Sequence, residues 1–216
     1  MSKSRVPSVF SGFLAVGFAV LSSANADPAV QYVSANAAIC SDSNSGSDLE
    51  HPKATIAAAV AALGENGGTV YVDRGEYQFD PPEQYAPLVT LSTPVEVVGL
   101  TSNAADVVIR RGTTEARGFK LEHEGARLRC LTIKGMFLQR SNSTTGGGID
   151  MSAGAVEDCV VCDTTGGHWD SKGAGIYMTG GRVSRCVLRN NTLLHQYPTA
   201  SWANQTTYGA AIYAKA

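Results

Sequence analysis

The strongest constraint on the fold of this chain is an internal repeat of 27 residues. Residues 146–165 (GGGIDMSAGAVEDCVVCDTT) align without a gap with residues 173–192 (GAGIYMTGGRVSRCVLRNNT). A repeat of this length, with short β-type runs and glycine at fixed places, is typical of a solenoid, in which each coil buries its inner face only against its neighbours. The alignment pairs Ile149 with Ile176, Met151 with Met178, Gly154 with Gly181, Val156 with Val183, Cys159 with Cys186 and Val160 with Val187.

Each repeat contains two short strand patterns separated by a corner. Ile149–Met151 alternates apolar, polar, apolar, which is the pattern of a strand with one buried face, and the run around Cys159 and Val161 alternates likewise. Val156 lies three residues before Cys159, so the period of two is broken and a bend is indicated. Gly154 supplies the backbone freedom that a tight bend needs.

The repeat extends in both directions along the chain. At an offset of 28, residues 118–133 place Leu128, Leu131 and Ile133 beneath Val156, Cys159 and Val161, whereas an offset of 29 would place Cys130 beneath Cys159. The apolar agreement favours 28. Residues 209–213 (GAAIY) begin another coil and put Ile212 on the same rung as Ile149 and Ile176, after which the sequence ends in mid-coil. An uncapped solenoid end exposes strand edges, so we expect either a fragment of a longer protein or an exposed face.

The other end of the repeat region has a helical pattern. Residues 54–63 (ATIAAAVAAL) follow Pro52 and precede Gly64, and place Ile56, Val60 and Leu63 on one stripe. Such a helix can plug the open mouth of the first coil. The sequence thus predicts an all-β chain, a right-handed parallel β-helix (solenoid) with a short N-terminal capping α-helix. Strands are expected at 69–72, 77–79, 88–91, 95–98 and 107–110.

The first 26 residues have the pattern of a cleaved signal peptide. Lys3 and Arg5 precede an apolar run at 9–21, and Ala24 and Ala26 form the small-x-small pattern that a signal peptidase cuts. A membrane anchor is the alternative, but a run of 13 residues is short for a bilayer, which needs about 20. We therefore expect a mature domain of residues 27–216, without a membrane span, that is secreted, periplasmic or at the cell surface.

Charge and cysteine content limit the partners. Removing Lys3 and Arg5 from the 17 basic residues leaves 15 against 19 acidic ones, a net charge of −4 without a basic cluster, so nucleic acid is not expected as a partner. Cys159 above Cys186 is interpreted as packing, because a disulfide between directly stacked strands would be strained. The spacing of Cys159 and Cys162 hints at metal or redox chemistry, but it directs the two side chains to opposite faces of a strand.

Several segments together resemble a known family. They are YVSANAAICSDSNSGS at 32–47, PKATIAAAVAAL at 52–63, GGTVYVDRGEY at 67–77 and the GGGI coils. This stretch resembles the N-terminal part of bacterial right-handed β-helix proteins of the pectate-lyase-like superfamily, and its coils are also similar to the repeats of polymorphic outer-membrane proteins. The resemblance implies the fold. It leaves the activity open, because this architecture serves polysaccharide lyases, glycoside hydrolases, phage tailspikes and non-enzymatic surface proteins.

Three loops are expected on one side of the solenoid, at 134–145, 163–172 and 193–208, because each follows a Cys-type strand and precedes a GxGI strand. Aromatic rings offer apolar faces to sugars, and acids with His or Lys can bind ligands or transfer protons. Polar residues are also common in any exposed loop, and the tryptophans can simply cover the wall. The candidate catalytic residues are Asp163, His168, Asp170 and Lys172, and the candidate glycan-binding residues are Trp169, Tyr177, Tyr197, Trp202 and Tyr213.

Asp150, Tyr177 and Tyr213 are predicted to stack in one outward column across three coils, a feature that suits glycan contact as well as sheet stabilisation. A lyase similar to pectate lyases would need acidic ligands for Ca²⁺ and a Lys or Arg base. A hydrolase similar to polygalacturonases would need paired carboxylates and a Gly-His-Gly motif, whereas Gly167 and His168 are followed by Trp169. The candidate metal ligands are Asp150, Asp163 and Asp170, for Ca²⁺ in a lyase only.

Three functions therefore stay open. The first is an exported solenoid that binds polysaccharide or another surface glycan, or mediates adhesion, without catalysis and without a cofactor. The second is a polysaccharide lyase or glycoside hydrolase whose catalytic coils are partly missing. The third is a fragment of a longer surface protein with no function of its own. The absence of family motifs favours the first.

Overall fold

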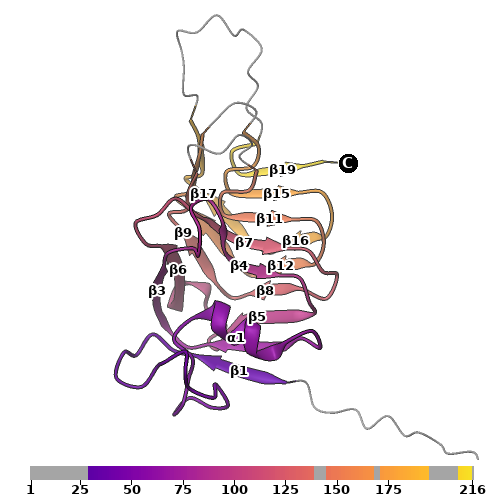
Figure 1. Cartoon of the computed structure of the whole chain (residues 1–216). Helices are drawn as coiled ribbons and strands as arrows, with labels where there is room; N and C mark the ends of the chain where they lie inside the picture. Colours follow the sequence, from indigo (N-terminus) through magenta and orange to yellow (C-terminus); the bar gives the residue numbers. More distant parts are fainter. Residues whose placement is uncertain (1–28, 139–144, 168–170, 195–208, 216) are drawn as a thin grey trace, which may run out of the picture.

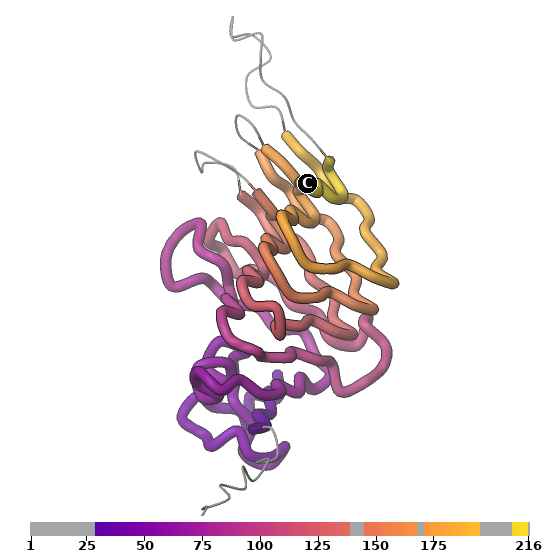
Figure 2. Tube along the Cα trace, turned by 90° about the vertical axis from the view of Figure 1, so that its right-hand side faces the viewer, coloured from indigo at the N-terminus to yellow at the C-terminus, as the bar shows by residue number. Residues whose placement is uncertain are grey.

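The computed structural model describes residues 29–138, 145–167, 171–194 and 209–215 of the chain. They form a parallel β-solenoid whose successive coils stack along one axis, with a single α-helix near the N-terminal coils (Figure 1). Figure 2, turned by 90°, shows the coils in sequence order from indigo to yellow. The predicted all-β parallel β-helix is confirmed.

The strands fall into three long parallel sheets and one short one. Sheet A contains β1 (Val30–Val33), β2 (Gly68–Val72), β5 (Val95–Gly99), β8 (Arg127–Arg129), β12 (Ala155–Glu157) and β16 (Arg182–Ser184). Sheet B contains β3 (Gly75–Phe79), β6 (Val107–Arg111), β9 (Thr132–Lys134), β13 (Val160–Cys162) and β17 (Val187–Arg189). Sheet C contains β4 (Pro87–Leu91), β7 (Arg117–Leu121), β11 (Ile149–Met151), β15 (Ile176–Met178) and β19 (Ile212–Ala214). Sheet D contains β10 (Phe137–Leu138), β14 (Thr165–Gly166) and β18 (Thr192–Leu193), and a short 3₁₀ helix, η1 (Ala104–Asp106), precedes β6.

The strand register follows the sequence repeat. Ile149 pairs with Ile176, which pairs with Ile212, so the three predicted rungs are confirmed. Val156 pairs with Leu128 in sheet A, which confirms the offset of 28. The predicted strands at 69–72, 77–79, 88–91, 95–98 and 107–110 all lie within observed strands, and β1 and the strands of sheet D were not predicted.

The core is a set of apolar columns inside the coils. In sheet A, Val70, Val97, Leu128 and Val156 stack in register and are fully buried. Each such side chain contributes about 1.5–3 kcal/mol when it leaves water. Because a coil contacts only its neighbours, this column and the matching columns of sheets B and C stabilise the stacking of successive coils.

The glycines of the GxGI motif have steric causes. Gly146, Gly173 and Gly209 have φ values of 59°, 63° and 61°, a backbone conformation that favours glycine. Gly148 has a different role, because a Cβ there would lie 2.5 Å from the carbonyl oxygen of Gly175 and 2.6 Å from a methyl group of Val161. The third glycine therefore allows sheet C to approach sheet B closely.

The corner between sheets A and B repeats in successive coils. Cys130, Asp158 and Arg185 occupy it with φ values of 54°, 53° and 52°. In each of these coils, the residue with this left-handed backbone conformation forms the bend between sheets A and B. This is the bend predicted from the break in period between Val156 and Cys159. Aspartate tolerates this conformation better than most residues, whereas Cys130 and Arg185 do so less readily.

Helix α1 (Ile56–Leu63) packs against β1, β2 and β4 and buries Ile56, Ala59 and Leu63 in the core. It begins two residues later than predicted, because the backbone N–H groups of Ala54 and Thr55 donate to Asp42 Oδ1 instead. Ala59 replaces Val60 as the central buried residue of the predicted stripe, and Val60 is partly buried. In the described part of the chain, no helix is long and apolar enough to cross a membrane.

All five cysteines are free. Cys159 is buried in the core, and its Sγ lies 3.2 Å from the carbonyl oxygen of Glu157. Cys186 lies one coil further on, so the predicted two-rung ladder is confirmed. Cys162 lies in β13 next to the inward-facing Val161 and lines the outer surface of sheet B, so the prediction that it faces away from Cys159 is also confirmed.

Candidate functional site

The outer face of sheet C carries one polar or aromatic side chain from each coil. Thr90, Lys120, Asp150, Tyr177 and Tyr213 are paired in direct register across β4, β7, β11, β15 and β19. Neighbouring strands of a sheet are about 4.8 Å apart, so these side chains form a straight column along the solenoid axis. We call this column the sheet C strip.

Within the strip, Asp150 is held by hydrogen bonds from Arg117 and Thr145. Its Oδ2 lies 2.6 Å from Nη1 of Arg117 and accepts a hydrogen bond of 3.3 Å from the Thr145 hydroxyl. The Arg117 and Asp150 side chains are only 15% and 16% exposed. Burial raises the pKa of Asp150, and the positive charge of Arg117 opposes this rise. The pair fixes the carboxylate in one position.

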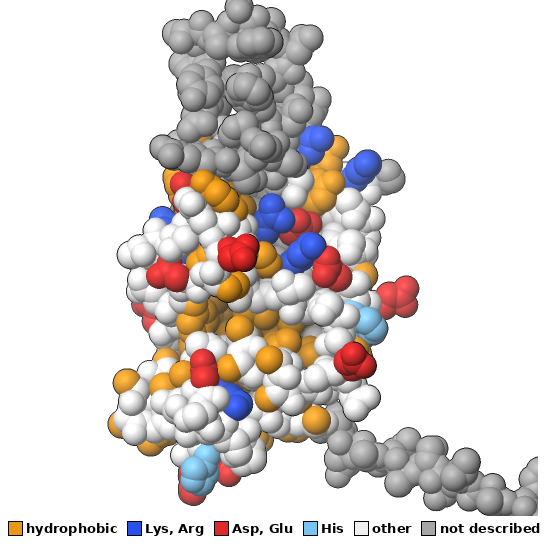
Figure 3. Space-filling model, viewed as in Figure 1, with side chains coloured by type: hydrophobic (Ala, Val, Ile, Leu, Met, Phe, Trp, Pro, Cys, Tyr) orange, Lys and Arg blue, Asp and Glu red, His pale blue; other side chains and the backbone are white. Residues whose placement is uncertain are grey.

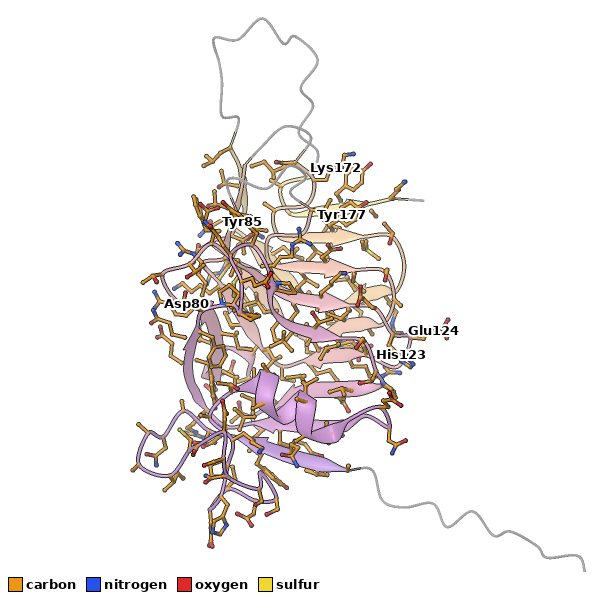
Figure 4. All side chains as sticks on the ribbon, in the orientation of Figure 1. Asp80, Tyr85, His123, Glu124, Lys172 and Tyr177 are labelled. Carbon is orange, nitrogen blue, oxygen red and sulfur yellow. The ribbon has the colours of Figure 1, made fainter. Side chains whose placement is uncertain are left out.

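Tyr177 and Tyr213 stack on one another at the C-terminal coils. Their ring centroids are 5.6 Å apart and their planes differ by 2°. Nζ of Lys172 lies 5.6 Å from the centre of the Tyr213 ring, as a cation–π contact. The ring faces that turn toward each other are therefore closed to a sugar. Figure 4 shows Lys172 and Tyr177 together at this end of the strip.

A second ion pair lies at the middle of the strip. Nζ of Lys120 is 2.5 Å from Oε1 of Glu122, and both side chains are moderately exposed. Lys120 lies next to Asp150 in the column. The strip thus places a hydrogen-bond donor beside an acceptor, followed by two phenol groups that can act as either.

Four of the predicted site residues come together here. Asp150, Tyr177 and Tyr213 form the predicted column, and Lys172 reaches it from the preceding loop. The pairing of the strands in sheet D places the beginnings of the three predicted loops side by side, and a bridge between Thr145 and Lys172 does the same for the ends of the first two. The other candidates, His168, Trp169, Asp170, Tyr197 and Trp202, lie outside the described residues.

Asp163 does not join the strip. It follows β13 at a corner with φ of 56°, accepts a hydrogen bond of 3.0 Å from Asn190 Nδ2 and lies 3.8 Å from Lys134 Nζ. The hydrogen bond from Asn190 lowers the pKa of Asp163. Asp163 and Asn190 occupy the same corner in successive coils, so their contact stabilises the turn.

The described residues do not provide a set of ligands for the predicted Ca²⁺ site. Asp150 is held by Arg117 and Asp163 by Asn190 and Lys134, so the two aspartates have separate partners. Among the residues that the structure describes, no three His, Cys, Asp or Glu side chains gather as a metal site requires. A Ca²⁺ site that includes Asp170 stays a prediction.

The sequence reasoning missed Arg117, Lys120, Glu122 and Thr145. Lys120 lies 30 residues before Asp150, whereas Leu128 lies 28 before Val156, so one offset cannot align both. The cause is the corner between sheets C and A, which has five residues at 122–126 and three at 152–154. Counting the two strands separately would have placed Lys120 in the column.

A hollow lies at the N-terminal end of the strip, between α1 and β4, where Thr90 is one of its lining residues. It has a volume of about 610 Å³ and its walls are mostly apolar, with Val60, Phe79 and Leu88 among them. Figure 3 shows hydrophobic side chains in the region above α1. Asp80 lies at its rim and accepts a hydrogen bond of 2.7 Å from the Thr114 backbone. This groove has apolar walls but few polar groups that could orient a ligand.

The chain matches no protein-family model, no curated protein and no solved structure. The relation to the pectate-lyase-like superfamily is therefore confirmed only at the level of the parallel β-solenoid, and the superfamily itself stays a prediction.

Proposed function

We propose that this protein binds a glycan along the sheet C strip. The single observation that carries the proposal is the register of Lys120, Asp150, Tyr177 and Tyr213, which presents an ammonium, a carboxylate and two phenols on successive coils. A hydroxyl-rich chain laid along the axis meets one such group per coil. Hydroxyl groups both donate and accept hydrogen bonds, so they can pair with the ammonium, the carboxylate and the phenols alike.

The rigidity of the strip supports binding. Asp150 is fixed by Arg117 and Thr145, and Tyr177 by its stack on Tyr213. Groups that are already ordered lose little conformational entropy when a ligand arrives. The phenol groups act here mainly through their hydroxyls and ring edges, because the stack covers one face of each ring.

The second candidate is a glycoside hydrolase or polysaccharide lyase. One observation favours it: burial raises the pKa of Asp150, as it does for a general acid. Hydrolysis also calls for a second carboxylate. Within the described residues, the other carboxylate beside the strip is Glu122, which is paired with Lys120. This pairing favours binding over acid–base chemistry.

Export belongs to the same proposal and is supported by the pattern of residues 1–26. A glycan-binding protein of this kind acts at the cell surface, in the periplasm or outside the cell, and serves binding or adhesion. Expression of the whole chain, cell fractionation and N-terminal sequencing test this. A mature N-terminus at Asp27 is expected, and full-length protein retained in the cytoplasm contradicts export.

The binding experiment uses the whole chain on a glycan array, followed by titration of the best ligand. We expect Tyr177→Ala and Asp150→Asn each to weaken binding at least tenfold. Tyr71→Ala is the matched control, because Tyr71 stacks on Tyr32 with centroids 5.5 Å apart but belongs to sheet A. Equal losses in Tyr177→Ala and Tyr71→Ala, or no glycan bound by the wild type, reject the strip.

The same glycans, incubated with the protein and Ca²⁺, test the second candidate. Release of reducing or unsaturated ends that Asp150→Asn abolishes would replace binding by catalysis as the function.

A further inference from the structure

A second polar surface lies at the corner where sheet C passes into sheet A. It is a cavity of about 400 Å³ between successive corner loops. Figure 4 labels His123 and Glu124, which belong to the first of these loops. The cavity is lined by Glu124, Arg127, residues 152–155, Gly181 and Arg182. It does not include the residues of the sheet C strip.

The cavity is framed by two arginines of one outward column. Arg127 pairs with Ala155, and Ala155 pairs with Arg182, in the register of β8, β12 and β16. The two arginines are thus two coils apart, or about 9.6 Å along the axis. The outward side chain on the strand between them is the methyl group of Ala155, which is itself buried. A longer side chain at this position would occupy part of the cavity that the two arginines line.

The charge of the two arginines is only partly neutralised: Glu157 pairs with Arg182, Glu124 lines the cavity, and Glu96 lies opposite Arg127 in the sheet register. Arg127 is exposed and forms no ion pair with any residue that the structure describes. Arg182 contacts Glu157 through Nη2 alone, which leaves its other N–H groups for a ligand. Glu157 also lies 4.0 Å from Nε of Arg129 and 3.8 Å from Nη2 of Arg185, so this one buried carboxylate is shared by three arginines.

We propose that the cavity between Arg127 and Arg182 binds a tetrahedral oxyanion, a sulfate or phosphate group that is free or esterified to a larger ligand. A guanidinium presents its N–H groups as a rigid fork, with N–H···O contacts of about 2.8 Å to an oxyanion. A tetrahedral group has oxygens on opposite sides and can accept from both forks at once. A planar carboxylate has two oxygens and is held well by one fork only.

Glu124 adds a second condition for the ligand of this cavity, which should also carry hydroxyl groups. Its carboxylate lies at the cavity edge and is exposed, so it repels a bare anion but accepts hydrogen bonds from hydroxyl groups. An ester whose carrier has hydroxyls next to the sulfate or phosphate satisfies both the arginines and Glu124. We therefore expect a hydroxyl-bearing ester to bind more tightly than the inorganic ion.

The test is a calorimetric titration of the whole chain with three probes: sodium sulfate, a sulfated oligosaccharide and the same oligosaccharide after desulfation. The sulfated form is expected to bind at least tenfold more tightly than the desulfated form. Binding of inorganic sulfate alone, with the same arginine dependence, supports the site with the free ion as its ligand. Equal binding of the sulfated and desulfated forms overturns the proposal.

Variants locate the site. Arg127→Gln, Arg182→Gln and Ala155→Leu should each reduce sulfate-dependent binding at least tenfold, the last by occupying part of the cavity. Arg110→Gln is the matched control, because Arg110 is an outward arginine of sheet B paired with Glu76. Arg127 is exposed and forms no ion pair with the described residues, so Arg127→Gln is not expected to unfold the protein. An Arg127→Gln variant that binds like Arg110→Gln contradicts the assignment.

The cavity and the sheet C strip have no lining residue in common and can be tested separately. Tyr177→Ala, which tests the strip, should leave sulfate-dependent binding unchanged. If the protein does not bind neutral glycans but binds sulfate through Arg127, the proposed strip is wrong and the proposed cavity is supported. If it binds neutral glycans through Tyr177 but does not bind sulfate, the strip is supported and the cavity is wrong.

Discussion

Nη1 of Arg117 lies 2.6 Å from Oδ2 of Asp150, although the two residues are 33 positions apart and belong to neighbouring coils. The pair lies on the outer wall of the solenoid, yet both side chains are mostly buried. It therefore differs from an exposed surface ion pair in its expected effect on stability.

Arg117→Leu should lower the free energy of unfolding by about 1.5–3 kcal/mol, the usual range for hydrogen bonds to charged groups, because it leaves the Asp150 carboxylate without its cation. Urea denaturation measures this. The exposed pair of Arg110 and Glu76 is the control, and Arg110→Leu should cost less than about 1 kcal/mol. Adding Asp150→Asn to Arg117→Leu should restore part of the loss. Equal losses for Arg117→Leu and Arg110→Leu would contradict this interpretation.

Asp158 should make stability depend on pH. Arg185 donates two hydrogen bonds to it, at 2.6 and 2.8 Å, and these lower the pKa of Asp158 below its ordinary value of 3.8. The depressed pKa belongs to the folded state, so this stabilisation is present above pH 3.8 and is lost as the pH falls through the folded pKa.

The Asp158→Asn variant isolates this effect, since asparagine tolerates the left-handed backbone but does not titrate. The advantage of the wild type in free energy of unfolding should shrink below pH 3.8, and it should be smaller in 1 M salt, which screens exposed charges. An advantage that stays constant from about pH 7 to about pH 2 would show that Asp158 contributes no such linkage.

Cys186 should be the reactive member of the cysteine ladder. A hydrogen bond from Cys159 lowers the pKa of Cys186 to about 7, whereas hydrogen bonding and burial raise the pKa of Cys159. In a Cys40→Ser background, alkylation followed by mass spectrometry should modify Cys186 with a rate midpoint near pH 7 and leave Cys159 unmodified. Cys159→Ala should move the midpoint toward the ordinary value of 9.0. If the midpoint of the alkylation rate does not change in Cys159→Ala, Cys159 does not lower the pKa of Cys186.

Gly148→Ala should destabilise the coil because its Cβ would collide with the Gly175 carbonyl and Val161. We expect the free energy of unfolding to fall by about 1–3 kcal/mol or more, because the Gly175 carbonyl belongs to the backbone and cannot move aside as a side chain can. Gly166→Ala is the control, because its closest contact is a terminal methyl of Leu193 at 3.2 Å. Thermal unfolding of both variants checks this, and a Gly148→Ala protein as stable as Gly166→Ala would refute the close approach of sheets B and C.

The repeat made the inner columns predictable. Ile149, Ile176 and Ile212 recur in a fixed frame, and the alternation along each short strand puts them on the face that turns toward the core. The contacts on the outer face of the solenoid were harder to predict from the sequence. The ion pair of Arg117 and Asp150 joins two coils whose corners between sheets C and A differ in length. The strand β1 was missed because its Val30–Val33 segment has no copy in the repeat and pairs with β2 across an intervening helix.

The candidate site was predictable only where it coincides with the repeat. The column of Asp150, Tyr177 and Tyr213 follows from the same alignment as the core. The cavity at Arg127 and Arg182 does not, since it arises from Ala155, a small residue that the sequence gives no reason to single out. Its significance appears only when the strands are in register.

The shared carboxylate of Glu157 has a mechanical consequence. Glu96, Arg129, Glu157 and Arg182 belong to β5, β8, β12 and β16, and their ion pairs run along the solenoid axis from coil to coil. Separating the coils between β5 and β16 would therefore have to break these ion pairs as well as the backbone hydrogen bonds of the sheets, and added salt should weaken the contribution of the ion pairs.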